Sequence, residues 1–263
     1  MTQAKSDATY PDLKDKVVLI TGAGAGLGRA MAVAFAKQGA RLLLNDLHKD
    51  AALETHALLE EFSGRAEIYP GSITDADVVD GLFSYAADTM GGVDILINNA
   101  GLSGVAPTAD LSRDAWNTCL DINLSAPLFC AQHALKGMSE KQKGVILNMS
   151  SIYGVVAAPK RAAYCATKAG LAMLTKVLAV EWAEFGVRVN AIAPGYAKTA
   201  LVDDLIDRGD IDVAALENRT PINRLITPEE VAALAVFLAS DAASSITGQT
   251  VAPDGGWTAY GYV

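Results

Sequence analysis

The fold of this chain is constrained most strongly by a regular alternation of short apolar runs with segments of helical period. Runs rich in Val, Ile and Leu occur at 16–21, 41–46, 93–98, 144–150, 187–193 and 248–252. Segments with the length and period of helices include 26–38, 49–63, 112–136, 162–185 and 227–239. Strands that are apolar along their whole length are typical of a parallel sheet covered on both faces. With right-handed crossovers, the pattern predicts a Rossmann-like, doubly wound α/β fold.

The alternation continues without a linker, an internal repeat or a low-complexity tract, so we expect one catalytic domain over 15–263. Hydrophobic residues make up 51% and charged residues 19%, which is a globular composition. Residues 1–14 are polar and predict a flexible tail. The longest interruption, 195–226, is charged and contains Gly209 and Pro221, which indicates a mobile flap over a cleft.

Charge and cysteine content exclude several classes of partner. The formal net charge of −9 disfavours nucleic acid, anionic membranes and acidic carrier proteins. Three cysteines without a CxxC pair indicate neither a disulfide framework nor a metal site. The start lacks the apolar core of a signal peptide, and no apolar run reaches the length of a membrane span. We therefore expect a cytoplasmic protein with a small-molecule substrate.

A glycine-rich stretch, TGAGAGLG at 21–28, directly follows the first apolar run and precedes a helical segment. In doubly wound sheets, ligands bind outside the carboxyl ends of the strands. Glycines there let the backbone turn sharply and approach a pyrophosphate, which the free N–H groups of the helix attract. The spacing departs from the strict G-x-G-x-x-G pattern, and a purely structural turn is the alternative. The setting favours a dinucleotide site.

Asp46 closes the second apolar run and distinguishes between the two nicotinamide cofactors. A carboxylate there can accept hydrogen bonds from both adenosine ribose hydroxyls, and it would repel the 2′-phosphate of NADP. Leu47 follows it, and no Lys or Arg occupies 23–25. The alternative is that Asp46 only caps the helix that starts after residue 48. We predict NAD as the cofactor.

The stretch YCATK at 164–168 places Tyr164 and Lys168 four residues apart on a helical segment, so both share one face. The spacing alone is weak evidence, because Tyr10 and Lys14 have it too. Pro11, however, disfavours helical geometry at Tyr10.

These residues and further motifs, in this order, resemble the short-chain dehydrogenases/reductases in their single-domain form. From about Lys16 to Gly256 the motifs are TGAGAGLG (21–28), NNAG (98–101), DINLS with Asn123, NMSSIYG with Ser151, YCATK (164–168), PGYAKT (194–199) and TGQTVAPDGG (247–256). Ser151 lies 13 residues before Tyr164, which matches the family spacing. The resemblance implies a seven-stranded parallel sheet flanked by helices. It also implies a homotetramer formed through 112–136 and 162–185.

The resemblance implies a set of site residues. The catalytic ones are Asn123, Ser151, Tyr164 and Lys168. Together with the residue patterns above, it predicts NAD contacts from Gly22, Gly26, Leu27, Gly28, Asp46, Leu47, Ser72, Ile73, Asn99, Ala100, Gly101, Tyr164, Lys168, Pro194, Gly195, Ala197 and Thr199. Where the family often has Asp-Val-Thr after the third strand, this chain has GSITD. Ser72 thus replaces an Asp that faces the adenine amine, while Ile73 can still cover the ring.

Alcohol oxidation explains why these residue types belong together. A free tyrosine, with a pKa of about 10, is a poor base near neutrality. We predict that the positive charges of Lys168 and of the nicotinamide lower the pKa of Tyr164, by about 1 to 3 units for a close charge. Ser151 can position the reacting oxygen. By analogy, Asn123 would hold a water that links Lys168 to solvent; otherwise it packs or kinks its helix.

The loops after the strands should supply the substrate contacts, from Ser103, Ser151, Tyr153 and Tyr196. The segment 197–226 holds six acidic and four basic residues and no evident phosphate or CoA clamp. We expect a small neutral hydroxylated substrate, such as a sugar, polyol or cyclic alcohol. A reductase or dehydrogenase of 3-oxoacyl or 3-hydroxyacyl groups is the alternative enzyme, disfavoured by Asp46 and the acidic surface. A silent dinucleotide-binding sensor is the alternative outside catalysis.

Overall fold

The computed structural model describes residues 8–62, 65–199, 202 and 212–261. Its seven strands form one sheet in the order β3-β2-β1-β4-β5-β6-β7, with every neighbouring pair parallel. The strands are β1 Val17–Thr21, β2 Arg41–Asp46, β3 Ala66–Pro70, β4 Ile95–Asn98, β5 Gly144–Met149, β6 Val187–Ile192 and β7 Thr250–Val251. The order reverses between β1 and β4, which confirms the predicted doubly wound fold.

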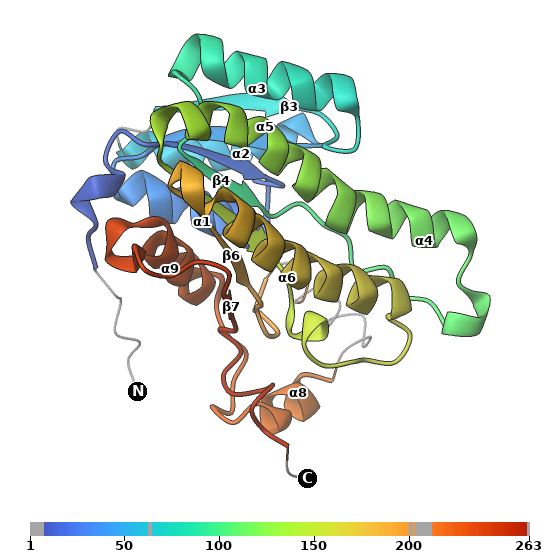
Figure 1. Cartoon of the computed structure of the whole chain (residues 1–263). Coiled ribbons are helices and arrows are strands. Elements are labelled where there is room, and N and C mark those ends of the chain that lie inside the picture. The colour runs from blue at the N-terminus through green and yellow to red at the C-terminus, as the bar shows by residue number, and fades with distance from the viewer. Residues whose placement is uncertain (1–7, 63–64, 200–201, 203–211, 262–263) are drawn as a thin grey trace.

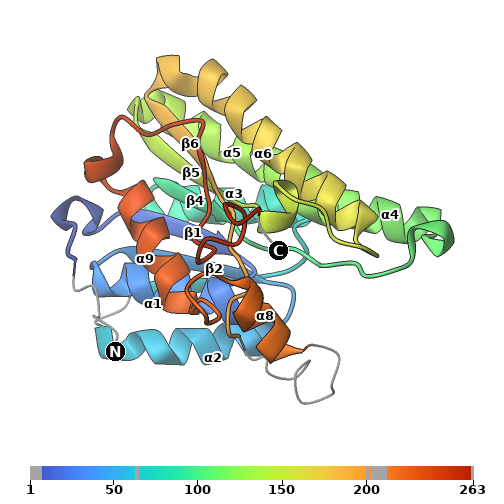
Figure 2. The ribbon, with the colours of Figure 1, turned by 90° about the horizontal axis from the view of Figure 1, so that it is seen from below.

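Helices cover both faces of the sheet (Figure 1). Figure 2 shows α1 Gly26–Lys37, α2 Lys49–Leu59 and α9 Pro228–Ala239 on one side, and α5 Ala126–Lys141 and α6 Ala162–Trp182 on the other. Alternate residues of β1 point to opposite sides: Val18 packs into the first layer and Leu19 into the second. Both cores are apolar, so the central strands read as continuous apolar runs.

The pattern of apolar runs and helical segments did not predict two elements, β3 and α3. Strand β3 lies at the edge of the sheet, and its side chains are partly exposed, so it lacks a continuous apolar run. Helix α3 Ala76–Met90 packs beside α5 and contributes to the second core. Its ends carry ordinary signals, since Asp75 accepts hydrogen bonds from the first turn and Gly91 adopts φ 79°.

The predicted helix 112–136 is interrupted where Asn123 lies. Helix α4 Arg113–Leu120 leads into a π-helical turn, Asp121–Ser125, and then into α5. The N–H of Ala126 bonds to the carbonyl of Asp121, five residues back. Pro127 has no N–H with which to complete the α-helical bond to the carbonyl of Asn123. Such π-turns often occur at functional sites.

The segments predicted to be mobile need one correction. Residues 1–7 lie outside the described residues, but Pro11–Leu13 forms a 3-10 helix whose Leu13 is buried in the first core. The predicted tail of 1–14 is therefore wrong for these residues, because an apolar side chain anchors them. In the predicted flap 195–226, residues 200–201 and 203–211 lie outside the described residues. Helix α8 Val213–Arg219 belongs to it, and a bridge between Ala197 and Ile226 joins its ends.

Candidate active site

The glycine turn lies at the carboxyl end of β1. Gly22 and Gly26 have φ values of 64° and 53°, a conformation that side chains disfavour. A Cβ on Gly28 would collide with the carbonyl of Gly22. The close contact between α1 and the glycine turn therefore requires a residue without a side chain at this position. Ala25, the N-cap of α1, offers no side-chain hydrogen bond. The N–H groups of the first turn of α1 therefore receive no side-chain cap from this residue.

Asn99 holds the glycine turn from the neighbouring strand. Its Nδ2 donates to the carbonyls of Thr21 and Gly22, both at 2.9 Å. In return, the hydroxyl of Thr21 accepts from the N–H groups of Asn99 and Ala100 at 3.0 and 3.1 Å. The NNAG motif thus supports the glycine turn, and the side-chain amide of Asn99 is bound to protein.

Asp46 faces the glycine turn from the end of β2. Its Oδ2 accepts from the N–H of Gly24 at 2.8 Å, and its Oδ1 accepts from the N–H of His48 at 2.9 Å. Each carboxylate oxygen keeps a further lone pair for a ribose hydroxyl. Arg29, on α1, donates to the carbonyl of Gly24 and forms an ion pair with Glu54 at 2.8 Å. This cation is therefore already neutralised.

The other predicted cofactor contacts surround the same edge. Leu47 is 64% exposed beside Asp46. After β3, Ser72 bonds through its hydroxyl to Thr74 at 2.8 Å, while Ile73 is buried in the second core. Leu27 packs against the first core, Pro194 accepts from the N–H of Ile152, Gly195 packs on Asp254, and Ala197 is buried.

Thr199 brings the loop after β6 back to the glycine turn. Its Cγ2 lies 3.7 Å from the position that a Cβ on Gly26 would occupy. Motifs far apart in the sequence therefore meet at one site. Both ends of a dinucleotide could be reached from this edge of the sheet.

Lys168 is buried at the carboxyl end of β5. Its Nζ donates to the carbonyl of Met149 at 2.7 Å and lies 5.7 Å from the ring centre of Tyr164. A Cβ on Gly101 would lie 3.4 Å from this Nζ and 2.8 Å from Oδ1 of Asn123. The structure therefore gathers Gly101, Asn123, Tyr164 and Lys168 in one place.

Ser151 follows β5 and is also buried. Its hydroxyl oxygen accepts the N–H of Tyr153 at 3.1 Å, as the N-cap of a short 3-10 turn. With its oxygen so engaged, the hydroxyl can donate its proton to a reacting oxygen.

Burial is the largest influence on the pKa values of Tyr164 and Lys168. It raises the pKa of Tyr164, while the hydroxyl of Ser151 and the charge of Arg161 oppose this rise. Burial also lowers the pKa of Lys168 to about 8. The predicted drop in the pKa of Tyr164 through Lys168 is therefore wrong for these side chains alone. Ser151 and Arg161 are the groups that favour the phenolate here.

Asn123 is fully buried and clamps the segment after NNAG. Its Oδ1 accepts from the N–H of Leu102 at 3.0 Å, and its Nδ2 donates to the carbonyl of Leu102 at 2.9 Å. The side-chain amide is thus occupied, so it is not available for the predicted water. The backbone carbonyl of Asn123, which the π-turn and Pro127 separate from its usual partner, is the atom that could hold one.

Comparison with known proteins identifies the family. A family model described as enoyl-(acyl carrier protein) reductase matches residues 22–258. The chain is 42% identical over 247 residues to cis-4-hydroxycyclohexanecarboxylate dehydrogenase of Sinomonas cyclohexanicum, covering 93% of this chain and 97% of that protein. It is 41% identical to D-threitol dehydrogenase of Mycolicibacterium smegmatis, covering 98% and 99%. A crystal structure of a short-chain type dehydrogenase/reductase from Mycobacterium marinum superposes with a TM-score of 0.89 at 33% identity, covering 95% and 98%.

The chain belongs to the short-chain dehydrogenases/reductases. It is therefore an oxidoreductase that acts on CH–OH groups and uses a nicotinamide dinucleotide, NAD or NADP. The glycine turn fits such a cofactor, because a Cβ on Gly28 has no room and the first turn of α1 lacks a side-chain cap. Asp46 and Lys168 would hold its two ribose groups.

Gly28→Ala should weaken NADH binding about tenfold or more, because the added methyl group must displace the carbonyl of Gly22 or the amide of Asn99. Fluorescence titration with NADH measures the dissociation constant. The matched control is Gly137→Ala on α5, where a Cβ meets nothing within 4 Å. It should bind NADH as the wild type does. Equal affinity of the Gly28 variant would contradict the placement of the pyrophosphate.

The predicted substrate residues are only partly brought together in this short-chain dehydrogenase/reductase. The hydroxyls of Tyr153 and Tyr196 are 2.8 Å apart. Ser103 is exposed. Its loop is joined to the segment between Tyr153 and α6 by a hydrogen bond from the N–H of Ala106 to the carbonyl of Lys160 at 2.9 Å.

Sequence reasoning missed Arg161 and Trp257 in this region. The ring of Trp257 lies 5.5 Å from that of Tyr196. Arg161 directly precedes α6 and lies over the ring of Tyr153 at 5.5 Å. Their positions, just before YCATK and just after TGQTVAPDGG, were the available signals.

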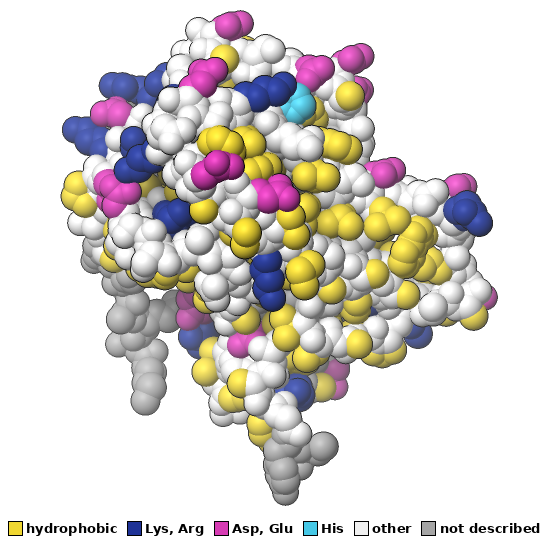
Figure 3. Space-filling view, viewed as in Figure 1, with side chains coloured by type: hydrophobic (Ala, Val, Ile, Leu, Met, Phe, Trp, Pro, Cys, Tyr) yellow, Lys and Arg dark blue, Asp and Glu magenta, His cyan; other side chains and the backbone are white. Residues whose placement is uncertain are grey.

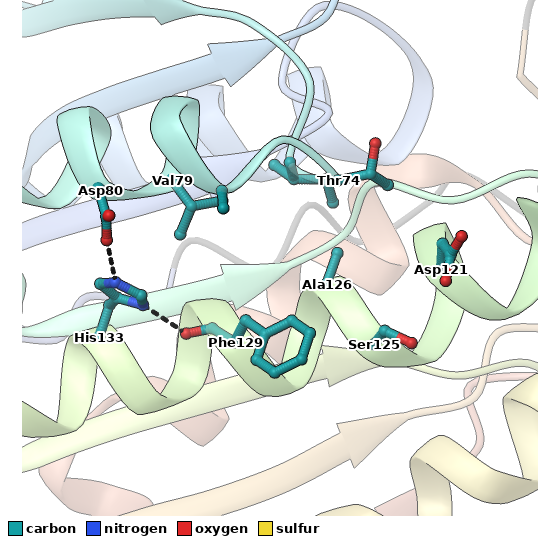
Figure 4. Close-up of a pocket in the computed structure, with 10 residues that line it drawn as sticks. Thr74, Val79, Asp80, Asp121, Ser125, Ala126, Phe129 and His133 are labelled. Carbon is teal, nitrogen blue, oxygen red and sulfur yellow. Dashed lines mark hydrogen bonds and ion pairs between the residues drawn. The ribbon is translucent and has the colours of Figure 1, made fainter.

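A cavity of about 290 Å³ lies elsewhere, between α3, the π-turn and α5 (Figure 4). Its lining is largely apolar, with Phe129 at its rim. His133 bridges to Asp80 at 2.7 Å across it. None of the four predicted catalytic residues lines it; of the predicted cofactor residues, only Ile73 does. Within the described ranges, no three His, Cys, Asp or Glu side chains gather as a metal site.

Proposed function

We propose that this protein is an NAD-dependent dehydrogenase that interconverts a secondary alcohol and a ketone, or a sugar and its lactone. The observation that carries the proposal is the arrangement of Tyr164 between the hydroxyl of Ser151 and the ammonium of Lys168, at the edge of the sheet where Asp46 faces the glycine turn. A small hydroxylated substrate is favoured, of the polyol, sugar or cyclic alcohol type. Two relatives named above act, by their names, on D-threitol and on cis-4-hydroxycyclohexanecarboxylate.

Each side chain has a distinct role in this proposal. Bound NAD supplies the hydride acceptor. The Ser151 hydroxyl donates a hydrogen bond to the substrate oxygen and fixes its position. Tyr164 takes the proton of that hydroxyl as general base. Lys168 holds the nicotinamide ribose, Ser151 and Arg161 favour the phenolate, and Asn123 positions the segment that contains Gly101.

The choice of NAD over NADP rests on the charges around the adenosine ribose. The carboxylate of Asp46 is fixed there by two backbone N–H groups, and Arg29 is paired with Glu54. The 2′-phosphate of NADP would face the carboxylate of Asp46. Arg29 would not offset the repulsion, because it is paired with Glu54, and like charges at an interface are strongly unfavourable.

Asp46→Ala should raise the ratio of kcat/KM for NADP to that for NAD about tenfold or more, because it removes both the repulsion and an acceptor for the ribose. Steady-state kinetics with both cofactors measure the ratio. Asp50→Ala, on the exposed first turn of α2, is the matched control and should leave it unchanged. An unchanged ratio in both variants would refute NAD selection by Asp46.

The function itself is tested with a panel of sugars, polyols and cyclic alcohols, followed by NADH formation. We expect at least one class to reduce NAD with a rate that depends on Tyr164. Binding of NAD without turnover of any alcohol would instead favour the sensor. Faster reduction of 3-oxoacyl substrates with NADPH would favour the acyl reductase.

We also propose that the chain assembles as a homotetramer through α5 and α6. Side chains of Phe129, Met173, Val177 and Val180 on these helices are 51%, 58%, 44% and 81% exposed. The helical stretch Ala162–Phe185 is apolar and long enough for a membrane span by composition, yet only 39% of its most apolar window is buried. Figure 3 shows hydrophobic side chains gathered on this face.

Such a surface fits a second copy in a cytoplasmic enzyme, because exposed apolar patches of this kind mark interfaces. Sedimentation should give the mass of four chains of 27.4 kDa each. A monomeric mass at micromolar concentration would refute the tetramer.

A further inference from the structure

Arg161 is an unusual arginine for its place. It directly precedes α6, is half-buried, and lies with its guanidinium carbon 5.5 Å from the ring centre of Tyr153. Within the described part of the chain, its N–H groups meet no carboxylate or carbonyl. Two other arginines with partly buried contacts differ from it: Arg224 pairs with Glu230 at 2.7 Å, and Arg188 donates to three carbonyls.

The phenols next to Arg161 also offer a donor. Tyr153 and Tyr196 share one hydrogen bond between their hydroxyls at 2.8 Å, so one of the two protons is used and the other meets no acceptor among the described residues. Tyr153 is tied to Ser151, because its N–H donates to the Ser151 hydroxyl. The residue that carries one of these phenols is therefore bound, through its backbone, to the serine that is proposed to hold the reacting oxygen.

The charge of Arg161 acts on both sides of this region. Burial raises the pKa of Tyr153 and of Tyr164, and the charge of Arg161 opposes both rises. Because the two phenols come from different elements, the guanidinium must lie within electrostatic range of each. Arg161, the N-cap of α6, also lies only three residues before Tyr164, so both belong to the same end of this helix.

We infer that Arg161 is a specificity-determining residue that binds a carboxylate of the substrate, with the Tyr153–Tyr196 pair donating to an oxygen of the same molecule. The substrate is then a small hydroxy acid. This rests on the proposed dehydrogenase function and replaces the expectation of a neutral substrate, which considered the charges of 197–226 alone. A guanidinium matches a carboxylate with two parallel hydrogen bonds, and its position over a ring leaves those N–H groups unused.

The test compares 4-hydroxycyclohexanecarboxylate with its primary amide as substrates, in the wild type, Arg161→Gln and Arg161→Lys. The wild type should favour the carboxylate at least about tenfold. Arg161→Gln should lower the ratio of kcat/KM for the carboxylate to that for the amide about 10- to 100-fold, mainly through the KM of the carboxylate, because any effect of the lost charge on Tyr164 is common to both substrates. Arg161→Lys should fall between them. Arg113→Gln, on exposed α4, should match the wild type.

Equal losses for both substrates would overturn the inference, since they would mean that Arg161 acts only through Tyr164 or through folding. A wild-type preference for the amide would overturn it too. Calorimetric titration of the NADH-saturated protein with cyclohexanecarboxylate tests the contact without turnover. Binding should weaken at least about tenfold in Arg161→Gln, and unchanged affinity overturns the inference. Absence of any alcohol oxidation would refute the proposed function, and the titration would still decide on Arg161.

Discussion

Tyr164→Phe is expected to lower kcat of alcohol oxidation about a thousandfold, within the range by which a positioned acid or base accelerates a reaction. Only the proton-transfer group is removed, so the affinity for NADH should stay within about threefold. Steady-state rates and fluorescence titration measure the two effects. Tyr85→Phe is the matched control, because its hydroxyl bonds to Glu67 at 2.9 Å away from the site. It should behave as the wild type.

The pH dependence gives a second check on the same residue. A phenol acting as base must first lose its proton, so the oxidation rate of the wild type should rise with pH and the rate of ketone reduction should fall. Burial raises the pKa of Tyr164, and the Ser151 hydroxyl opposes this rise. Ser151→Ala should therefore move the rising limb to higher pH. A Tyr164→Phe variant with a tenth of normal activity or more would refute the assignment.

Lys168→Met should lower kcat/KM for NAD about a hundredfold or more, since the ammonium is proposed to hold the nicotinamide ribose next to the reacting groups. Methionine keeps most of the side-chain volume at this buried position, so loss of the core is avoided. Both the affinity for NADH and kcat should fall, in contrast to Tyr164→Phe. Unchanged NADH affinity would remove Lys168 from the cofactor site.

The free energy of unfolding gives a second comparison between the wild type and Lys168→Met, through its dependence on pH. Burial lowers the pKa of Lys168 from 10.5 to about 8, so between these values the unfolded chain binds more protons than the folded one. The free energy of unfolding of the wild type therefore gains with rising pH from this group. Relative to Lys168→Met, the gain should be about 2 kcal/mol between pH values of about 7.5 and 9.5. Chemical unfolding at several pH values measures it.

The control for this comparison is Lys136→Met, an exposed lysine on α5. Its difference from the wild type should not change with pH over this range. A constant difference for the Lys168 variant as well would mean that Lys168 keeps an ordinary pKa in the folded protein.

Most of the fold could be predicted because its signals are local. Strand β5 is buried along its whole length and reads as an apolar run, whereas β3 at the sheet edge does not. The π-turn at Asn123 is consistent with the missing N–H of Pro127 and was not predicted. The hydrophobic period of a sequence does not show whether a backbone N–H bonds to the carbonyl four or five residues before it.

The site divides in a similar way. Asp46 and Ser151 were predicted from the ends of apolar runs, Tyr164 and Lys168 from the YCATK spacing on a helix, and the structure brings them to one edge. Arg161 belongs to no motif, and its significance appears only from its position over Tyr153 and from the absence of acceptors among the described residues. The catalytic roles of all these residues stay predictions until the variants are measured.

The sequence by itself determined the alternation of strands and helices, the glycine turn and the Tyr164–Lys168 pair, because each depends on periods or spacings within one element. Only the tertiary structure decided that Asn123 clamps Leu102, that Lys168 bonds to Met149, and that Tyr153 meets Tyr196 below Arg161. These contacts join residues from separate segments. Their distances and burial depend on how the strands and helices pack, which no local pattern encodes.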